Sequence, residues 1–266
     1  MEFNFETPLI LRLRKISHSK TMLWCGIMFA LSVLVIVIEN IISFNLYGDY
    51  PDLYSLFDLA FSVFLTVPFL AVFISARNKD SVLPTGGFTA AGILCILSSV
   101  VFAVSNVIYY RIHRIGYIFV YISVSDKVYP GGLPDRLYEN DLINVKITGA
   151  VLFTVMILFC LILAATFFSA ASVAKNNKPR RFFPILLTVL SFAITPFYIV
   201  RFIYFLIAGD FYRLASQLIN AYFYLPFEYV LFFIVSFISE FIISPITLIL
   251  CGCMGIGFAK ASRRIK

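Results

Sequence analysis

Charged residues are scarce in this sequence. Only 13% of its 266 residues are Asp, Glu, Lys or Arg, and 61% are hydrophobic, whereas a soluble domain is about a quarter charged and about half apolar. So few polar side chains cannot cover a water-exposed surface without leaving apolar patches that would aggregate. The mean hydropathy of +0.95 and the 30 Phe therefore predict a protein whose surface faces lipid.

Several chemical signatures are also missing. There is no His-Glu-x-x-His motif, no Gly-x-Ser-x-Gly elbow and no Walker A loop, so we expect neither an enzyme nor a cofactor. The loops contain no cysteine, which argues against a disulfide framework. All five cysteines lie in apolar runs, and we interpret them as small packing residues. Cys251 and Cys253 have no second pair that would complete a metal site.

Six apolar runs are long enough to cross a bilayer as a helix, which needs about 20 residues. They cover residues 22–44, 53–76, 87–110, 147–174, 182–208 and 227–258. The sequence thus predicts an all-α integral membrane protein, a bundle of six transmembrane helices in one domain over residues 22–260. The last run contains Pro245, so we expect one kinked or tilted helix, or a span preceded by an interfacial segment.

The basic residues predict the orientation of this bundle. Fourteen Lys and Arg lie on the side of both termini and six on the other side. Because cytoplasmic loops carry the excess of Lys and Arg, both termini are expected in the cytoplasm. All 15 Tyr, which favour the interface, lie in outer loops or outer halves of the runs. Cysteine-free loops and the lack of an Asn-x-Ser/Thr acceptor favour a bacterial inner membrane.

Three segments lie outside the predicted spans. Residues 1–21 mix apolar and basic side chains, as in an amphipathic segment on the inner leaflet or in a disordered tail. Residues 111–146 form one short outer loop subdomain, where alternation at 117–122 predicts a short strand or an interfacial extension before a turn. Residues 261–266 form a basic cytoplasmic tail. The cations occur in short clusters and not as a stripe, so no nucleic-acid partner is expected.

Four charged residues and one Asn within the predicted spans are candidate site residues. A charged side chain in a bilayer costs roughly 2.5–3.5 kcal/mol, so an embedded charge is a candidate functional residue. The candidates are Glu39, Asp58, Asn106, Arg201 and Glu240. With a rise of about 1.5 Å per residue, all five lie in the outer half, with Glu240 expected closest to the middle. The alternative is that they reach the interface or form structural ion pairs.

The acidic surplus among these candidates predicts a cationic guest, or a carboxyl that binds and releases a proton. We therefore expect a transport component, either a small carrier or the membrane subunit of a transporter. In architecture alone, the chain is similar in plan to the membrane subunits of some ATP-driven exporters, which leaves room for a partner membrane or ATPase subunit. The alternative is a non-transporting accessory, immunity or assembly protein whose embedded polar residues are structural.

Overall fold

The fold is that of a helical bundle. The structure is a computed structural model and describes residues 8–47, 53–77, 85–113, 139–176, 180–207, 231, 234–235 and 237–262. Regular structure in these ranges is helical throughout. The elements are α1 (Pro8–Ser17), α2 (Lys20–Tyr47), α3 (Leu53–Arg77), α4 (Thr85–His113), α6 (Glu139–Asn176), α7 (Phe182–Ile207), the π-helix η1 (Ser239–Ile243) and α10 (Ser244–Ala261).

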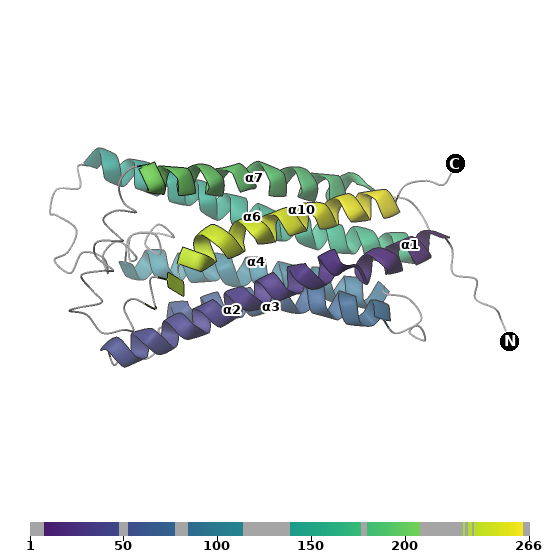
Figure 1. Ribbon diagram of the computed structural model, residues 1–266, viewed down its shortest axis with the longest axis horizontal. Coiled ribbons are helices and arrows are strands. Elements are labelled where there is room, and N and C mark those ends of the chain that lie inside the picture. The colour runs from purple at the N-terminus through teal and green to yellow at the C-terminus, as the bar shows by residue number, and fades with distance from the viewer. Residues whose placement is uncertain are drawn as a thin grey trace.

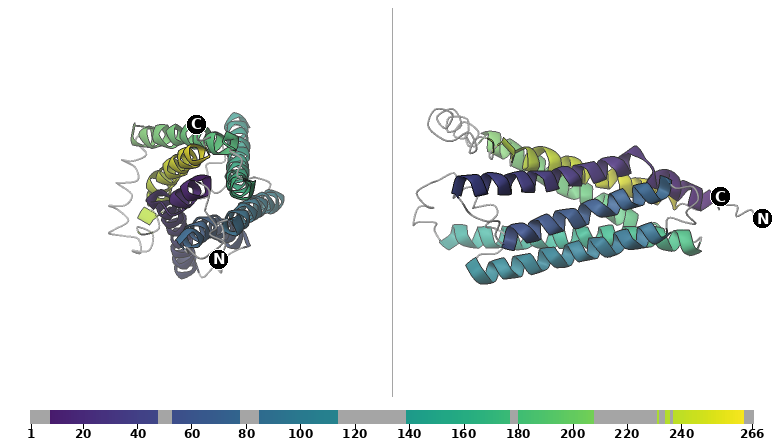
Figure 2. Two further views of the ribbon diagram at one scale, coloured as in Figure 1. Left: turned by 90° about the vertical axis from the view of Figure 1, so that its right-hand side faces the viewer. Right: turned by 90° about the horizontal axis from the view of Figure 1, so that it is seen from below.

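Six long helices follow one another around an elongated bundle (Figure 1). α2 packs against α3, α3 against α4, α4 against α6, α6 against α7 and α7 against α10, and α10 returns to α2. The end-on view in Figure 2 shows the same arrangement, with α1 among the helix ends nearest the viewer. α1 contacts α3, α6 and α10, so it touches helices from different sides of this closed ring.

The apolar character of these helices matches the predicted class. Five stretches have the length and hydropathy needed to cross a membrane: Leu9–Ile42, Gly86–Ser105, Phe153–Lys175, Phe182–Val200 and Phe241–Ala261. In α3, the apolar stretch found among the described residues is the shorter Leu59–Ile74. The prediction of an all-helical protein is therefore confirmed for the described residues, where five helices are long and apolar enough to cross a membrane.

The helix boundaries differ from the predicted spans mainly around the expected outer loop. α4 continues to His113, and α6 begins at Glu139, so both helices extend into the range 111–146. Hydropathy detects only the apolar part of a helix, whereas acidic residues such as Glu139 and Asp141 favour the first turn of a helix because of its dipole. The predicted strand or extension at 117–122 lies outside the described residues.

The last predicted span contains a change of helix type. Pro245 lies in the first turn of α10, directly after η1. The backbone N–H of Ser244 donates to the carbonyl of Ser239, and its hydroxyl donates to the same oxygen at 3.0 Å. Proline has no N–H to donate to the preceding turn, and an inserted π-turn is one way in which a helix adjusts its register. Of the run 227–258, residues 227–230, 232, 233 and 236 lie outside the described part.

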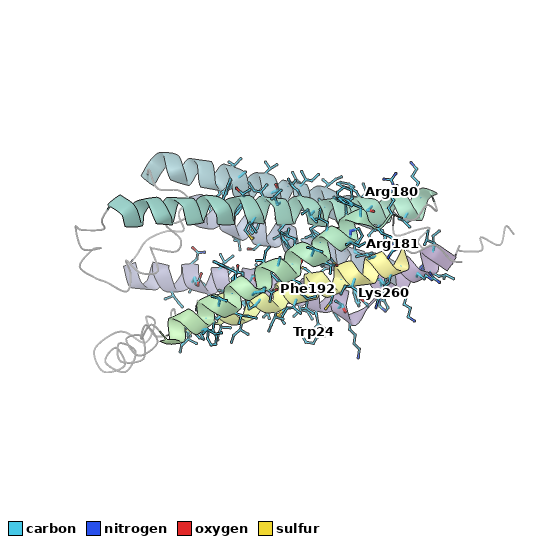
Figure 3. All side chains as sticks on the ribbon, turned by 90° about the horizontal axis from the view of Figure 1, so that it is seen from above. Trp24, Arg180, Arg181, Phe192 and Lys260 are labelled. Atoms are coloured by element: carbon cyan, nitrogen blue, oxygen red, sulfur yellow. The ribbon has the colours of Figure 1, made fainter. Side chains whose placement is uncertain are left out.

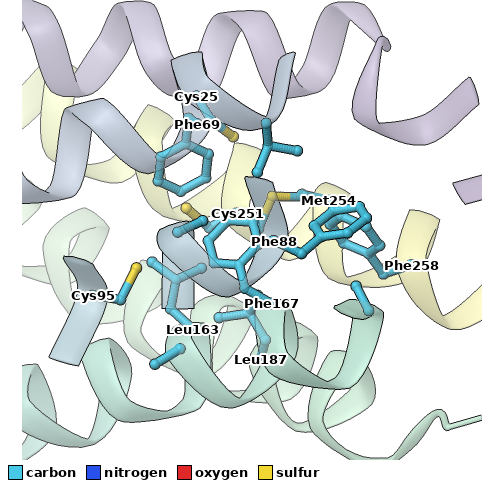
Figure 4. Close-up of a cluster of buried hydrophobic side chains, with 14 of the residues drawn as sticks. Cys25, Phe69, Phe88, Cys95, Leu163, Phe167, Leu187, Cys251, Met254 and Phe258 are labelled. Atoms are coloured by element: carbon cyan, nitrogen blue, oxygen red, sulfur yellow. The ribbon is translucent and has the colours of Figure 1, made fainter. Parts of the chain in front are cut away.

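Aromatic side chains fill the centre of the bundle (Figure 4). Phe69, Phe88, Phe167 and Phe258 are fully buried, and each comes from a different helix. The Phe167 ring lies 5.7 Å from Phe69 and 6.4 Å from Phe258 between centroids, in edge-to-face geometry. Edge-to-face pairs add about 0.5–1.5 kcal/mol beyond the area that they bury. The interior of this region is therefore densely packed.

The N-terminal helix α1 turns its apolar face into the bundle. Leu9 and Leu13 are buried, whereas Arg12 and Lys15 are exposed. Leu9, Leu13 and Ile16 recur at helical spacing, which places them on one face. α1 ends before a two-residue break, His18 and Ser19, in which the Ser19 hydroxyl accepts a hydrogen bond from the N–H of Met22 at 3.3 Å, as an N-cap of α2 would. Residues 8–17 are thus helical and pack on the bundle, and the membrane-surface role expected for residues 1–21 stays a prediction.

Candidate functional site

The predicted site residues lie on five different elements. They are Glu39 on α2, Asp58 on α3, Asn106 on α4, Arg201 on α7 and Glu240 on η1. Glu39 is half-buried. For the other four residues the structure describes the position along the helix and not the side chain. Their grouping is therefore argued from where the helices place them.

All five positions fall at one level of the bundle. We name as the basic end the end where α2, α4 and α7 begin and where α3, α6 and α10 terminate. Counted from these helix ends, the five residues lie 19 to 21 positions away: Lys20 to Glu39, Arg77 to Asp58, Thr85 to Asn106, Phe182 to Arg201 and Ala261 to Glu240. At about 1.5 Å per residue this is about 28–32 Å, close to the hydrocarbon thickness of a bilayer, about 30 Å.

Helix ends give the level of Glu240 relative to the other candidates, and its expected depth in the membrane stays a prediction. That expectation placed Glu240 nearest the middle of the membrane, because the apolar run extends far to either side of it. Counted from the end of α10 at Ala261, Glu240 lies no deeper than Asn106 counted from the start of α4. An apolar run does not reveal where its helix ends, so the depth of a residue inside it cannot be read from the run.

Three of the five residues lie on neighbouring elements. η1 contacts both α2 and α7, which places the elements of Glu240, Glu39 and Arg201 side by side. Asp58 follows on α3, which packs against α2, and Asn106 is one helix further on α4. Asn40, the residue after Glu39, donates its side-chain amide to the carbonyl of Ile36 at 2.8 Å. Its polarity is thus satisfied within its own helix.

The backbone at Glu240 is itself unusual. Glu240 is the second residue of η1, and π-helical turns are rare and frequent at functional sites. In membrane helices, interruptions of the regular hydrogen bonding are tolerated where other groups satisfy the freed backbone, as the two bonds from Ser244 to the Ser239 carbonyl do here. An acidic residue and a change of helix type therefore coincide at the level of Glu39, Asp58, Asn106, Arg201 and Glu240, the five residues that we name the polar layer.

The structure also brings together residues that the sequence did not connect. Cys25, Cys95, Cys160 and Cys251 come from four helices and are all fully buried. The thiols of Cys251 and Cys25 lie within hydrogen-bonding reach, and Cys95 and Cys160 are in the same region of the bundle. Figure 4 shows three of these thiols beside the aromatic residues. Cys253 is exposed. Among the described residues, no group of three or more Cys, His, Asp or Glu is placed to hold a metal ion.

Cations gather at the basic end. Lys20, Lys175, Arg180, Arg181 and Lys260 are all exposed there. The Nε of Arg181 donates to the carbonyl of Ala259 at 3.3 Å, so the start of α7 is tied to the last turn of α10 (Figure 3). The hydroxyl of Ser169 donates to the carbonyl of Arg180 at 3.5 Å. The sequence predicted the charge clusters, whereas their convergence depends on how α6, α7 and α10 pack.

These observations define a class. A bundle of apolar helices, five of them long enough to cross a bilayer, is a helical membrane protein. Comparison with known protein families, with characterised proteins and with solved structures finds no match for the chain. Its function therefore has to be argued from its own residues.

Proposed function

We propose that this chain is a transport component, a small carrier or the membrane subunit of a transporter, with a cation or proton site in the polar layer opposite the basic end. Glu240, Glu39 and Arg201 form the centre of that site, with Asp58 and Asn106 at its margin. The observation that carries the proposal is the common level of the five residues, combined with the contacts of η1 with α2 and α7.

The chemistry of the layer favours a cation. The set contains three carboxyl groups and one guanidinium group, so acidic groups are in surplus. A carboxyl of this kind exchanges a proton for another cation, which is the elementary step of coupled transport. Interrupted helices are common at the substrate sites of membrane transporters, and the π-helix places such an interruption at Glu240.

The proposal includes a topology. The chain crosses the membrane six times, because α3 spans it in addition to the five helices that are long and apolar enough. Both termini lie in the cytoplasm at the basic end, because Lys and Arg are retained on that side. The polar layer then faces the outside of a bacterial inner membrane. The chain acts without a catalytic step of its own, and a second membrane subunit or an ATPase would dock at the basic end. A tag after Lys266 should be accessible only in inverted vesicles.

The experiment combines two variants with a matched control. Glu240→Gln and Arg201→Met each remove one charge from the layer, whereas Asn40→Leu removes a polar side chain at the same level that bonds its own helix. The purified proteins are melted with chlorides of sodium, potassium, choline and spermidine, and at stepped pH. A ligand at 100 times its Kd stabilises the folded state by about 2.7 kcal/mol. The stabilisation should occur in wild type and Asn40→Leu and be lost in both charge variants.

The alternative function is that of a non-transporting accessory, immunity or assembly protein. The packed aromatic interior favours it, because Phe69, Phe88, Phe167 and Phe258 leave the centre of the bundle closed. In that case the layer holds helices together. Both charge variants would then melt at a lower temperature, and none of the added cations or pH steps would stabilise the wild type.

A further inference from the structure

The basic end carries charge of one sign. Among the residues described there, every charged side chain is a cation, contributed by α1, α2, α6, the start of α7 and α10. Like charges at close range repel one another, and this repulsion destabilises the folded state unless an anion reduces it. The membrane supplies anions at this depth, in the phosphates of its lipid headgroups.

One of these cations, Arg181, is anchored to the residue that precedes Lys260 on α10. The bond from Arg181 Nε to the carbonyl of Ala259 fixes the guanidinium group beside the last turn of α10, where a basic residue satisfies a carbonyl that has no helical partner. The next residue on α10 is Lys260, and both Arg181 and Lys260 are exposed. A guanidinium that is already oriented loses less entropy when it binds a phosphate.

Aromatic side chains accompany these cations. Phe182 and Phe183 follow Arg181 directly, are exposed and pack edge to face at 5.2 Å between ring centroids. On α2, which packs against α10, Trp24 is 48% exposed and lies one turn after Lys20. Aromatic rings beside cations are typical of the interface between lipid headgroups and acyl chains. Figure 3 shows Arg181 and Lys260 toward the same end of the bundle, with Trp24 farther from that end.

From these observations we propose that Arg181 and Lys260 form a binding site for the phosphate of an anionic phospholipid, whose acyl chains lie along the outer surface of α10 toward Trp24. The occupant is a lipid of the surrounding membrane. This inference does not depend on transport. The proposed site differs from the general attraction of a basic surface for anionic lipid. Only two of the several cations at the basic end, Arg181 and Lys260, should determine the preference for anionic over zwitterionic lipid.

Trp24 is a natural reporter, since it is the single Trp of the chain. The protein is reconstituted in phosphatidylcholine vesicles that contain either brominated phosphatidylglycerol or brominated phosphatidylcholine at equal mole fraction. Bromine on the acyl chain quenches nearby Trp fluorescence. We expect stronger quenching by the anionic lipid in the wild type. Removing one cation should lower the relative affinity about fivefold, the factor that corresponds to about 1 kcal/mol per basic residue near the membrane surface.

Three variants separate the site from its surroundings. Arg181→Gln and Lys260→Gln should each reduce the preference, whereas Lys175→Gln, which removes an exposed cation from the same end on α6, should retain it. Arg181→Lys keeps the charge without the guanidinium fork and should show an intermediate loss. Since Lys260 is exposed, Lys260→Gln tests the site even if the Arg181 variants unfold.

Three results would overturn the proposal. The wild type could show equal quenching by both lipids, which means that no anionic lipid is enriched near Trp24. Lys175→Gln could lose as much preference as Lys260→Gln, which means that the attraction is spread over the whole basic end. Inorganic phosphate in millimolar excess could abolish the preference, which would assign the site to a soluble anion.

Discussion

Gly255 offers the sharpest test of how α10 packs. A Cβ atom added there would lie 2.5 Å from the hydroxyl oxygen of Thr188 and 2.7 Å from the carbonyl oxygen of Pro184, both on α7. Ordinary contacts of a Cβ exceed 3.4 Å, so α7 and α10 would have to separate. Separation would also stretch the bond from the Thr188 hydroxyl to the carbonyl of Gly252, which is already 3.3 Å long. Gly255→Ala therefore combines overpacking with a weakened interhelical bond.

The expected cost follows from these contacts. Overpacking typically costs about 1–3 kcal/mol, and an interhelical hydrogen bond in a membrane protein contributes about 0.6 kcal/mol on average. Gly255→Ala should therefore lose about 2–3 kcal/mol, which lowers the melting temperature by roughly 4–12 °C for a chain of this size. The neighbouring Gly257 is the control, since a Cβ there meets Ile16 at 3.4 Å, an ordinary contact.

The assay is thermal unfolding of both variants in the same detergent, followed by the loss of monodisperse protein. Gly257→Ala should change the melting temperature little, because alanine also favours the helix over glycine. Equal melting of Gly255→Ala and wild type would refute the close approach of α7 and α10. A larger loss in Gly257→Ala than in Gly255→Ala would mean that the face of α10 turned to α7 is assigned wrongly.

Three further predictions concern other contacts. Ser98→Ala removes the buried hydrogen bond, 3.0 Å long, from the Ser98 hydroxyl to the carbonyl of Phe61 on α3. The free energy of unfolding should fall by about 0.5–1.5 kcal/mol, and an unchanged denaturant-unfolding curve would contradict the contact. A lipid-soluble maleimide should label Cys253 in the folded protein and the four buried cysteines only after unfolding. Mass spectrometry counts the attached maleimide groups in each state. In Ile16→Cys/Gly257→Cys, oxidation should link α1 to α10, because the side chain of Ile16 approaches a Cβ at Gly257 to 3.4 Å; failure to cross-link would show that α1 is not docked.

The helices were largely predictable, but the start of α6 and the change of helix type before α10 were not. Hydropathy detects the requirement of the lipid for apolar side chains, and α2, α3, α4 and α7 lie within a few residues of the predicted spans. A helix can continue past the apolar region, as α6 does at Glu139. From Pro245 the sequence predicted a kink and not the π-turn that precedes it. A proline shows where a backbone hydrogen bond is missing, but it does not show how the backbone compensates.

The polar layer was predictable as a set of residues but not as an arrangement. A charged side chain within an apolar run is recognisable in a sequence because it is costly in lipid, and Glu39, Arg201 and Glu240 are of this kind. That η1 contacts α2 and α7 follows from the order of helices around the ring, which hydropathy does not contain. The convergence of four cysteines was missed for the same reason. Each cysteine lies in its own run and carries no signal of its neighbours.

The two halves of the bundle place different demands on any transport function. Toward the basic end, Phe258 packs against Phe88 and Phe167 at 5.8 and 6.4 Å between ring centroids, and the docked α1 contacts three helices there. A cation bound in the polar layer would have to pass this region, so a carrier needs a second arrangement in which α1 and these rings separate. An accessory protein needs no second arrangement. Locking α1 to α10 through Ile16→Cys/Gly257→Cys should therefore stop transport while leaving binding in the polar layer intact, and it should leave an accessory function unchanged.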